Sequence, residues 1–186
     1  RLGEQVAFMD AHPEVGVCSS WYRRFGAMND VVQDPADDAA IRASSLFGLR
    51  LQYGACMLRR AVVEEHRLRC DEDWLVPGMD FLFLLSIGAH AKYANIAKVL
   101  TDYRIGEQNM AHGRDRASDR TALSRETFRH FGLTVSDAEL ELHMMLHSFH
   151  LKPPDAARVK GLRAWMTHVA EWNRRERHFD PVLFEA

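Results

Sequence analysis

The chain has 186 residues, of which 47% are hydrophobic, enough for one substantial core and a smaller appendage. Its formal net charge is −2, so the chain has no excess of basic residues and we expect no nucleic-acid partner. Three cysteines without CxxC spacing (Cys18, Cys56 and Cys70) argue against a disulfide framework and favour a reducing environment. No apolar run approaches the roughly 18 residues that cross a bilayer, and the chain opens with Arg1 in a helical pattern, without a signal peptide. We therefore expect a cytoplasmic protein and leave open a peripheral position at the inner face of the membrane.

The first 110 residues predict an α/β fold in which a mixed sheet is layered with helices. Apolar residues at helical spacing predict helices over residues 1–11, 39–47, 60–66 and 80–88. Short runs of small and apolar residues predict strands over residues 15–21, 53–58, 92–96 and 99–104. The polar segments 26–38 and 71–79 are expected to be loops.

The remaining residues predict a helical C-terminal extension. Three helices are expected, over residues 114–131, 136–151 and 155–177. Ser136 and Glu139 have the spacing of a capping box at the start of the second helix. We place the domain boundary between residues 112 and 113, and the helices 114–186 could also serve as a homo-oligomerisation module.

Three segments of the front half resemble, in order, parts of the family 2 glycosyltransferases of the GT-A fold. The segment RLGEQVAFMDAHPEVGVCSSW (1–21) is similar to the family's stretch "RL–xx–Q–xx–F … HP–x–VG", which follows its metal-binding aspartate motif. YGACMLRRAVVEEHRLRCDEDW (53–74) resembles "HPSVMFRR…YDEDF", and GMDFLFLLSIGAHAKYANIAKVLTDYR (78–104) resembles "AEDYDLWLRLLEKGKFANIPEVLLYYR". Each segment is weakly specific alone, but their order and spacing together are more specific.

The resemblance implies the C-terminal, acceptor-side portion of an enzyme of cell-surface polysaccharide biosynthesis. Such enzymes transfer a sugar from a nucleotide-sugar donor to a hydroxyl of a saccharide or lipid-linked acceptor, usually with inversion. A divalent cation, Mg²⁺ or Mn²⁺, is expected in the full-length enzyme. Because the nucleotide-binding strands and the Asp-x-Asp motif would lie upstream of Arg1, this chain alone is expected to bind neither donor nor metal and to be inactive.

Asp80 matches the position of the general base in the resemblance. It begins an apolar helix, where the helix dipole and free amides favour an ionised carboxylate that can accept a proton. The alternative is that Asp80 only caps its helix. The resemblance also implies an acceptor pocket shaped by Trp74, and we add Tyr53 and Met79 to its lining. Arg59 and Arg104 are candidate phosphate-binding residues, although Arg59 could instead cap a turn.

Three residues depart from the family pattern. Met79 replaces a glutamate before the base, Leu82 replaces an aspartate, and Gly106 replaces a histidine that can contact metal or diphosphate. His112 could substitute for that histidine. These departures motivate a second hypothesis, a degenerate, non-catalytic domain that binds a glycan or a partner protein.

Three further patterns have competing interpretations. His143, His147 and His150, with Glu139, could bind zinc from one helical face, but we favour an amphipathic helix and assign no metal ligand. The stripe of Trp165, Val169 and Trp172 could face lipid or a partner, but we favour a core stripe. The acidic run 71–73 could hold a cation or form the turn that the resemblance implies.

Overall fold

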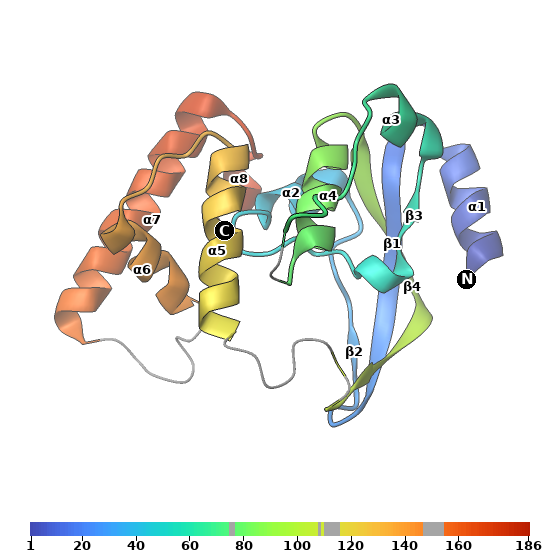
Figure 1. The fold of residues 1–186 in the computed structure, drawn as a ribbon, viewed down its shortest axis with the longest axis horizontal. Coiled ribbons are helices and arrows are strands. Elements are labelled where there is room, and N and C mark those ends of the chain that lie inside the picture. The colour runs from blue at the N-terminus through green and yellow to red at the C-terminus, as the bar shows by residue number, and fades with distance from the viewer. Residues whose placement is uncertain (75–76, 108, 110–115, 147–154) are drawn as a thin grey trace. The chain divides into compact units, whose positions relative to one another are not determined.

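The computed structural model describes residues 1–74, 77–107, 109, 116–146 and 155–186 (Figure 1). The chain forms two compact units, Arg1–Arg114 and Asp115–Ala186, which are described separately below. Within the described ranges, no helix combines the length and the apolar character that crossing a bilayer requires.

The first unit is an α/β body built around one central strand. Its helices are α1 (Leu2–Ala11), α2 (Asp38–Ala43), the 3₁₀-helix η1 (Tyr53–Ala55), α3 (Arg60–Glu65) and α4 (Met79–Gly88). Its strands are β1 (Val15–Gly26), β2 (Asp30–Val32), β3 (Met57–Leu58) and β4 (Lys92–Ile105). Every other strand pairs with β1, β4 in parallel and β2 and β3 antiparallel, so the sheet is mixed. The predicted α/β class with a mixed sheet is confirmed.

The strands differ from the prediction in three places. β1 continues to Gly26 and turns into β2, so the prediction of a loop over 26–38 is wrong for this hairpin. The two strands predicted over 92–96 and 99–104 form one strand, because a bulge lets Ile96 and Val99 face the successive residues Ser20 and Trp21. The strand predicted over 53–58 is reduced to β3, and η1 precedes it.

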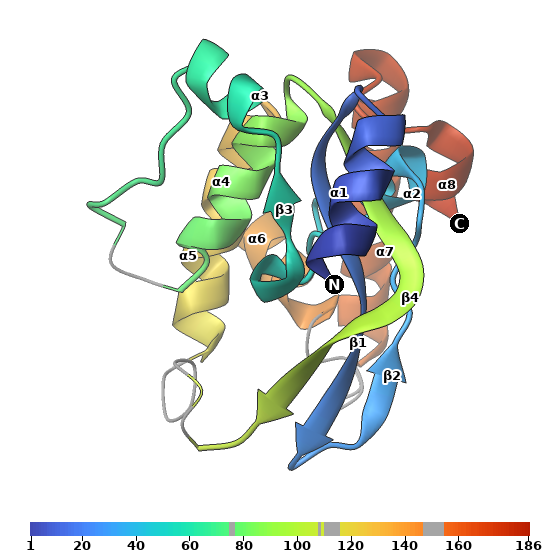
Figure 2. The ribbon, with the colours of Figure 1, turned by 90° about the vertical axis from the view of Figure 1, so that its right-hand side faces the viewer.

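Helices cover both faces of the sheet. On one face, Met9 of α1 packs with Val15, Cys18 and Ala94. On the other face, α2 and α4 form a second cluster, whose buried members are Val17, Ile41, Leu84, Ile87 and Tyr93. Figures 1 and 2 show α1 and α4 on opposite sides of β1. The successive residues Val17 and Cys18 of β1 therefore enter different cores, as expected for a strand covered on both faces. Val15 shares the core of Cys18 because the strand is irregular between Val15 and Val17.

Buried amides fix the loop that leads into η1. The Nε2 of Gln5, which has no solvent exposure, donates to the carbonyls of Cys18 (3.1 Å) and Ala55 (2.6 Å). The Nδ2 of Asn95 donates to the carbonyls of Pro35 (2.7 Å) and Arg50 (2.9 Å). Buried carbonyls need such partners in place of water, so the segment from residue 50 to 55 is held at both ends.

Tyr93 ties the end of α4 to the start of β4. Its hydroxyl donates to the carbonyl of Leu84 at 2.9 Å, and its ring is 2% exposed. The ring lies where a Cβ on Gly88 would stand, since that atom would be 1.8 Å from the Tyr93 hydroxyl. Only glycine allows this close approach.

The second unit is helical. Its helices are α5 (Arg116–His130), α6 (Asp137–Leu146), α7 (Ala156–Glu176) and α8 (Pro181–Glu185). The predicted core stripe is confirmed, because Trp165, Val169 and Trp172 are at most 3% exposed. The predicted capping box is also confirmed: the Glu139 carboxylate accepts from the Ser136 amide at 2.8 Å, and Ser136 Oγ accepts from the Glu139 amide at 3.3 Å. The prediction missed α8.

Substituting Gly88 tests the close approach of α4 to Tyr93. We expect Gly88→Ala to lower the free energy of unfolding by about 3 kcal/mol, because the buried ring has to move away and lose its bond to Leu84. Thermal or urea denaturation followed by circular dichroism measures the change.

Gly3→Ala is the matched control, because Gly3 is also helical and a Cβ there meets nothing within 4 Å. It should leave stability unchanged or raise it by up to about 1 kcal/mol. Equal stabilities of the two variants would contradict the packing described here.

Candidate functional site

A pocket of about 360 Å³ opens at the N-terminal end of α4. It is lined by Leu49, by residues 51–54, by Asp80, Phe81 and Leu84 of α4, and by Tyr103 of β4. The volume lies in the range of small-molecule sites, and the lining combines apolar side chains with a few polar groups. The pocket therefore brings together two predicted site residues, Asp80 and Tyr53, from segments far apart in the sequence.

Asp80 is the charged side chain of this lining. It lies in the first turn of α4 and is half-buried, and its Oδ1 accepts from the amide of Phe81 at 2.8 Å. The helix is capped at Gly78, whose φ of 114° suits glycine, so Asp80 is not the N-cap residue. The single bond leaves further lone pairs on the carboxylate, which can accept a proton or a hydrogen bond.

Tyr53 lines the pocket from η1. Its side chain is 44% exposed, and burial, followed by the nearby Cys70, Asp80 and Cys56, raises the pKa of its hydroxyl. The hydroxyl therefore stays protonated at neutral pH and can donate a hydrogen bond into the pocket.

Tyr103 completes the lining from the far end of β4, and the sequence analysis did not select it. Asn109 donates from Nδ2 to the Tyr103 hydroxyl at 3.2 Å. The ring of Tyr22 meets the Tyr103 ring edge to face, with centroids 6.3 Å apart. The position of Tyr103 in the pocket depends on the register of the sheet, which the sequence does not show. The only local sign of its role is that it precedes Arg104 in the Tyr-Arg pair.

The remaining predicted acceptor residues do not line this pocket. Met79 precedes Asp80 and is 37% exposed. Trp74 is half-buried, and its buried indole N–H has no hydrogen-bond partner among the described residues. The acceptor-binding role of Met79 and Trp74 stays a prediction.

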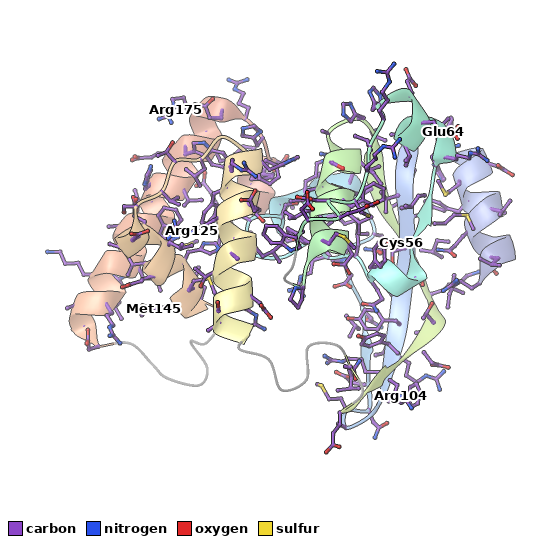
Figure 3. The ribbon with its side chains drawn as sticks, viewed as in Figure 1. Cys56, Glu64, Arg104, Arg125, Met145 and Arg175 are labelled. Carbon is purple, nitrogen blue, oxygen red and sulfur yellow. The ribbon has the colours of Figure 1, made fainter. Side chains whose placement is uncertain are left out.

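The two predicted phosphate-binding arginines lie apart from this pocket. The guanidinium of Arg59 donates to the carbonyls of Val15 (2.8 Å), Met9 (2.8 Å) and His12 (3.0 Å), so it joins α1 to β1. Arg104 is exposed beside Phe25, near the β1–β2 turn (Figure 3). Arg59 thus has a structural role of the kind that the alternative interpretation, capping of a turn, allowed, and a phosphate contact by either arginine stays a prediction.

The described residues contain no group of three or more His, Cys, Asp or Glu side chains that could hold a metal ion. In the acidic run, Asp71 Oδ1 accepts from the amide of Asp73 at 3.0 Å, which makes a local turn. His143 is buried against Phe128, with ring centroids 4.8 Å apart. His147, His150 and His112 lie outside the described residues.

A larger pocket of about 560 Å³ lies within the helical unit, between α5 and α6. Its wall includes Leu140, Met144 and Met145, and Arg125 and Asp137 form an ion pair of 2.6 Å there. Figure 3 labels Arg125 and Met145 on this part of the chain. Arg120 and Glu141 also line this larger pocket. We take the smaller pocket beside Asp80 as the candidate site, because it brings together the predicted site residues Asp80 and Tyr53.

The thiols near the candidate site are poor nucleophiles. Burial raises the pKa of Cys56 to about 12 and that of Cys18 to about 11. The Cys56 thiol donates to the carbonyl of Gln52 at 3.3 Å. Burial, followed by the nearby Asp80, also raises the pKa of Cys70. Because the thiolate is the reactive form, cysteine catalysis does not suit this site at neutral pH.

No known family model matches this chain, and no curated protein is significantly similar to it.

Alkylation tests the burial of these thiols. In native protein at pH 7.5, we expect iodoacetamide to modify Cys70, which is half-buried, well before Cys18 and Cys56. A pKa raised by two units or more lowers the thiolate fraction about 100-fold, and burial blocks access further. Peptide mass spectrometry over time measures the rates, and in denaturant the three rates should converge. Native labelling of Cys56 as fast as Cys70 would contradict the burial.

Proposed function

We propose that this chain is the acceptor-side part of a glycosyltransferase, in which Asp80 is the general base. The observation that carries the proposal is the pocket itself: one carboxylate at the start of α4, faced by Tyr53 and Tyr103. The segment resemblance supports the proposal, because Asp80 stands where the family 2 enzymes have their base. The nucleotide sugar is the proposed donor, and a saccharide or lipid-linked hydroxyl is the proposed acceptor.

In the proposed reaction, an acceptor hydroxyl within about 3 Å of Asp80 gives its proton to the carboxylate. The hydroxyl oxygen then forms a bond to the anomeric carbon of the donor. The bond from that carbon to the phosphate oxygen breaks, and the nucleoside diphosphate leaves with the electron pair. Attack opposite to the leaving group inverts the anomeric configuration.

The lining residues would orient the acceptor for this step. The Tyr53 hydroxyl is protonated at neutral pH and can donate to an acceptor oxygen. Phe81 and Tyr103 offer aromatic surface for a sugar ring. Holding the hydroxyl beside the base lowers the entropic cost of the reaction.

The proposed Mg²⁺ or Mn²⁺ ion would stabilise the leaving diphosphate when bound. The described residues offer no set of three ligands for it, so they do not fit such an ion. Arg59 already binds three carbonyls, so a phosphate contact by its guanidinium would compete with these bonds.

Asp80→Asn tests the base directly. In the gene product that contains this chain, we expect the turnover of nucleotide sugar to fall by about 10²- to 10⁴-fold, because the amide cannot accept the proton. Acceptor binding should change by less than about threefold, because Asn keeps the shape and one oxygen for the Phe81 amide. Product formation and acceptor titrations are the measurements.

Asp102→Asn is the matched control, because Asp102 is an exposed carboxylate of β4 that pairs with Arg23 outside the pocket lining. It should retain full turnover. Unchanged turnover in Asp80→Asn would refute the assignment of the base.

A second candidate function is glycan binding without turnover. It is favoured by the single carboxylate of the pocket and by Met79, Leu82 and Gly106 at positions where the family has polar groups. It predicts saccharide binding by the wild type together with no transfer from any nucleotide sugar. Metal-dependent donor binding by the gene product would eliminate it.

A further inference from the structure

We infer that Tyr103 is the platform on which the acceptor sugar lies, that Asn109 sets the orientation of this platform, and that the pocket selects an uncharged sugar ring over an anionic one. The inference rests on the proposed function, because it names the acceptor class for the same site.

Tyr103 is held in place while its ring stays accessible. It is 37% exposed although it lines the pocket, so one part of the ring remains open to a ligand. Tyr22 supports the ring from β1 by an edge-to-face contact. A fixed aromatic face binds the C–H face of a sugar well, because the negative ring face meets weakly positive hydrogens and little rotamer freedom is lost.

Asn109 links Tyr103 to the turn after β4. Its Oδ1 accepts from the Gly106 amide at 2.6 Å, while its Nδ2 donates to the Arg104 carbonyl (3.1 Å) and to the Tyr103 hydroxyl (3.2 Å). The side chain thus closes the turn and fixes the outer end of the ring. Asn109 does not line the pocket, so it acts as a positioning residue.

The charge of the lining predicts the acceptor class. Asp80 is the charged side chain among the lining residues. Arg50 lies between two lining leucines in the sequence, but it is largely exposed and its guanidinium faces Asp34 at 3.9 Å. Arg1 donates to the Gly54 carbonyl and is exposed. An anionic sugar would therefore lie beside a carboxylate, with no cation among the described lining residues to compensate, and the repulsion would weaken its binding.

Matched pairs of methyl glycosides test this inference. We would titrate the chain with methyl β-glucoside and methyl β-galactoside, and with the corresponding uronides, in which a carboxylate replaces the C6 hydroxymethyl group. Ligand-observed NMR or calorimetry gives the affinities. We expect at least one neutral glycoside to bind at least about tenfold more tightly than its uronide. Equal or tighter binding of the uronides, or no binding of either neutral glycoside, would overturn the inference.

Variants of Tyr103 and Asn109 separate the platform from its orientation. Tyr103→Leu should weaken neutral-glycoside binding about tenfold, because the ring is lost. Tyr103→Phe keeps the ring but not the bond to Asn109, so its affinity for the neutral glycoside should fall about threefold. Asn109→Ala should lower this affinity by at least the same factor. The double variant Tyr103→Phe with Asn109→Ala should bind no more weakly than Asn109→Ala alone, because Asn109→Ala already removes the bond that Tyr103→Phe removes. Additive losses would contradict the positioning role.

Phe25→Leu is the matched control, because Phe25 is an aromatic residue of β1 that is 42% exposed and does not line the pocket. It should leave glycoside affinity unchanged. If Phe25→Leu lowered glycoside affinity as much as Tyr103→Leu does, the loss would be a general effect of removing surface rings. This result would overturn the inference that Tyr103 is the platform.

Turnover of the gene product distinguishes this inference from the proposed function. If Tyr103→Leu raises the acceptor KM about tenfold with little change in kcat, the inference holds. If Asp80→Asn abolishes turnover while Tyr103→Leu leaves the acceptor KM unchanged, the inference fails and the proposed function stands. If Asp80→Asn retains turnover while the glycoside pairs behave as expected, the general base fails and the platform stands.

Discussion

The guanidinium of Arg42 holds the C-terminal end of α4 against the sheet, and the candidate site depends on this contact. It donates to the carbonyls of Gly88 and Ala91 at 2.8 Å and lies over the Tyr93 ring, 4.9 Å from its centroid. Asp38 pairs with Arg42 and accepts from the Tyr93 amide, so α2, α4 and β4 share one junction. Half-buried charge-assisted bonds of this kind are strong and directional. With one end of α4 fixed, its other end presents Asp80 to the pocket.

The sequence predicted the layered α/β body well, because buried strands and apolar helices have strong local patterns. It did not predict the register in which β4 pairs with β1, because the bulge between Ile96 and Val99 depends on the pairing of the two strands and not on a local pattern. The β1–β2 hairpin was missed because the polar segment after Gly26 has no alternation. The short helix α8 had a readable signal, an Asp180 cap followed by Pro181 at the first helical position.

The candidate site was only partly predictable. Asp80 could be selected by its place at the start of an apolar helix, and Tyr53 by the resemblance of its segment, and the fold brings the two together. Tyr103 could not be selected, because its approach to the pocket follows from the register of β4 and from its bond to Asn109. Arg59 was ambiguous in sequence, since a strand-end arginine can satisfy carbonyls as readily as it can bind phosphate.

Mapping a bound sugar onto the backbone tests most directly whether the pocket at the start of α4 receives the acceptor. The chain labelled with ¹⁵N would be titrated with the methyl glycoside that binds most tightly, and amide shifts would be followed by NMR. The account predicts that the largest shifts cluster at residues 51–54, at Phe81 and at Tyr103. Shifts confined to the helical residues 116–146 and 155–186, with those amides unmoved, would contradict it.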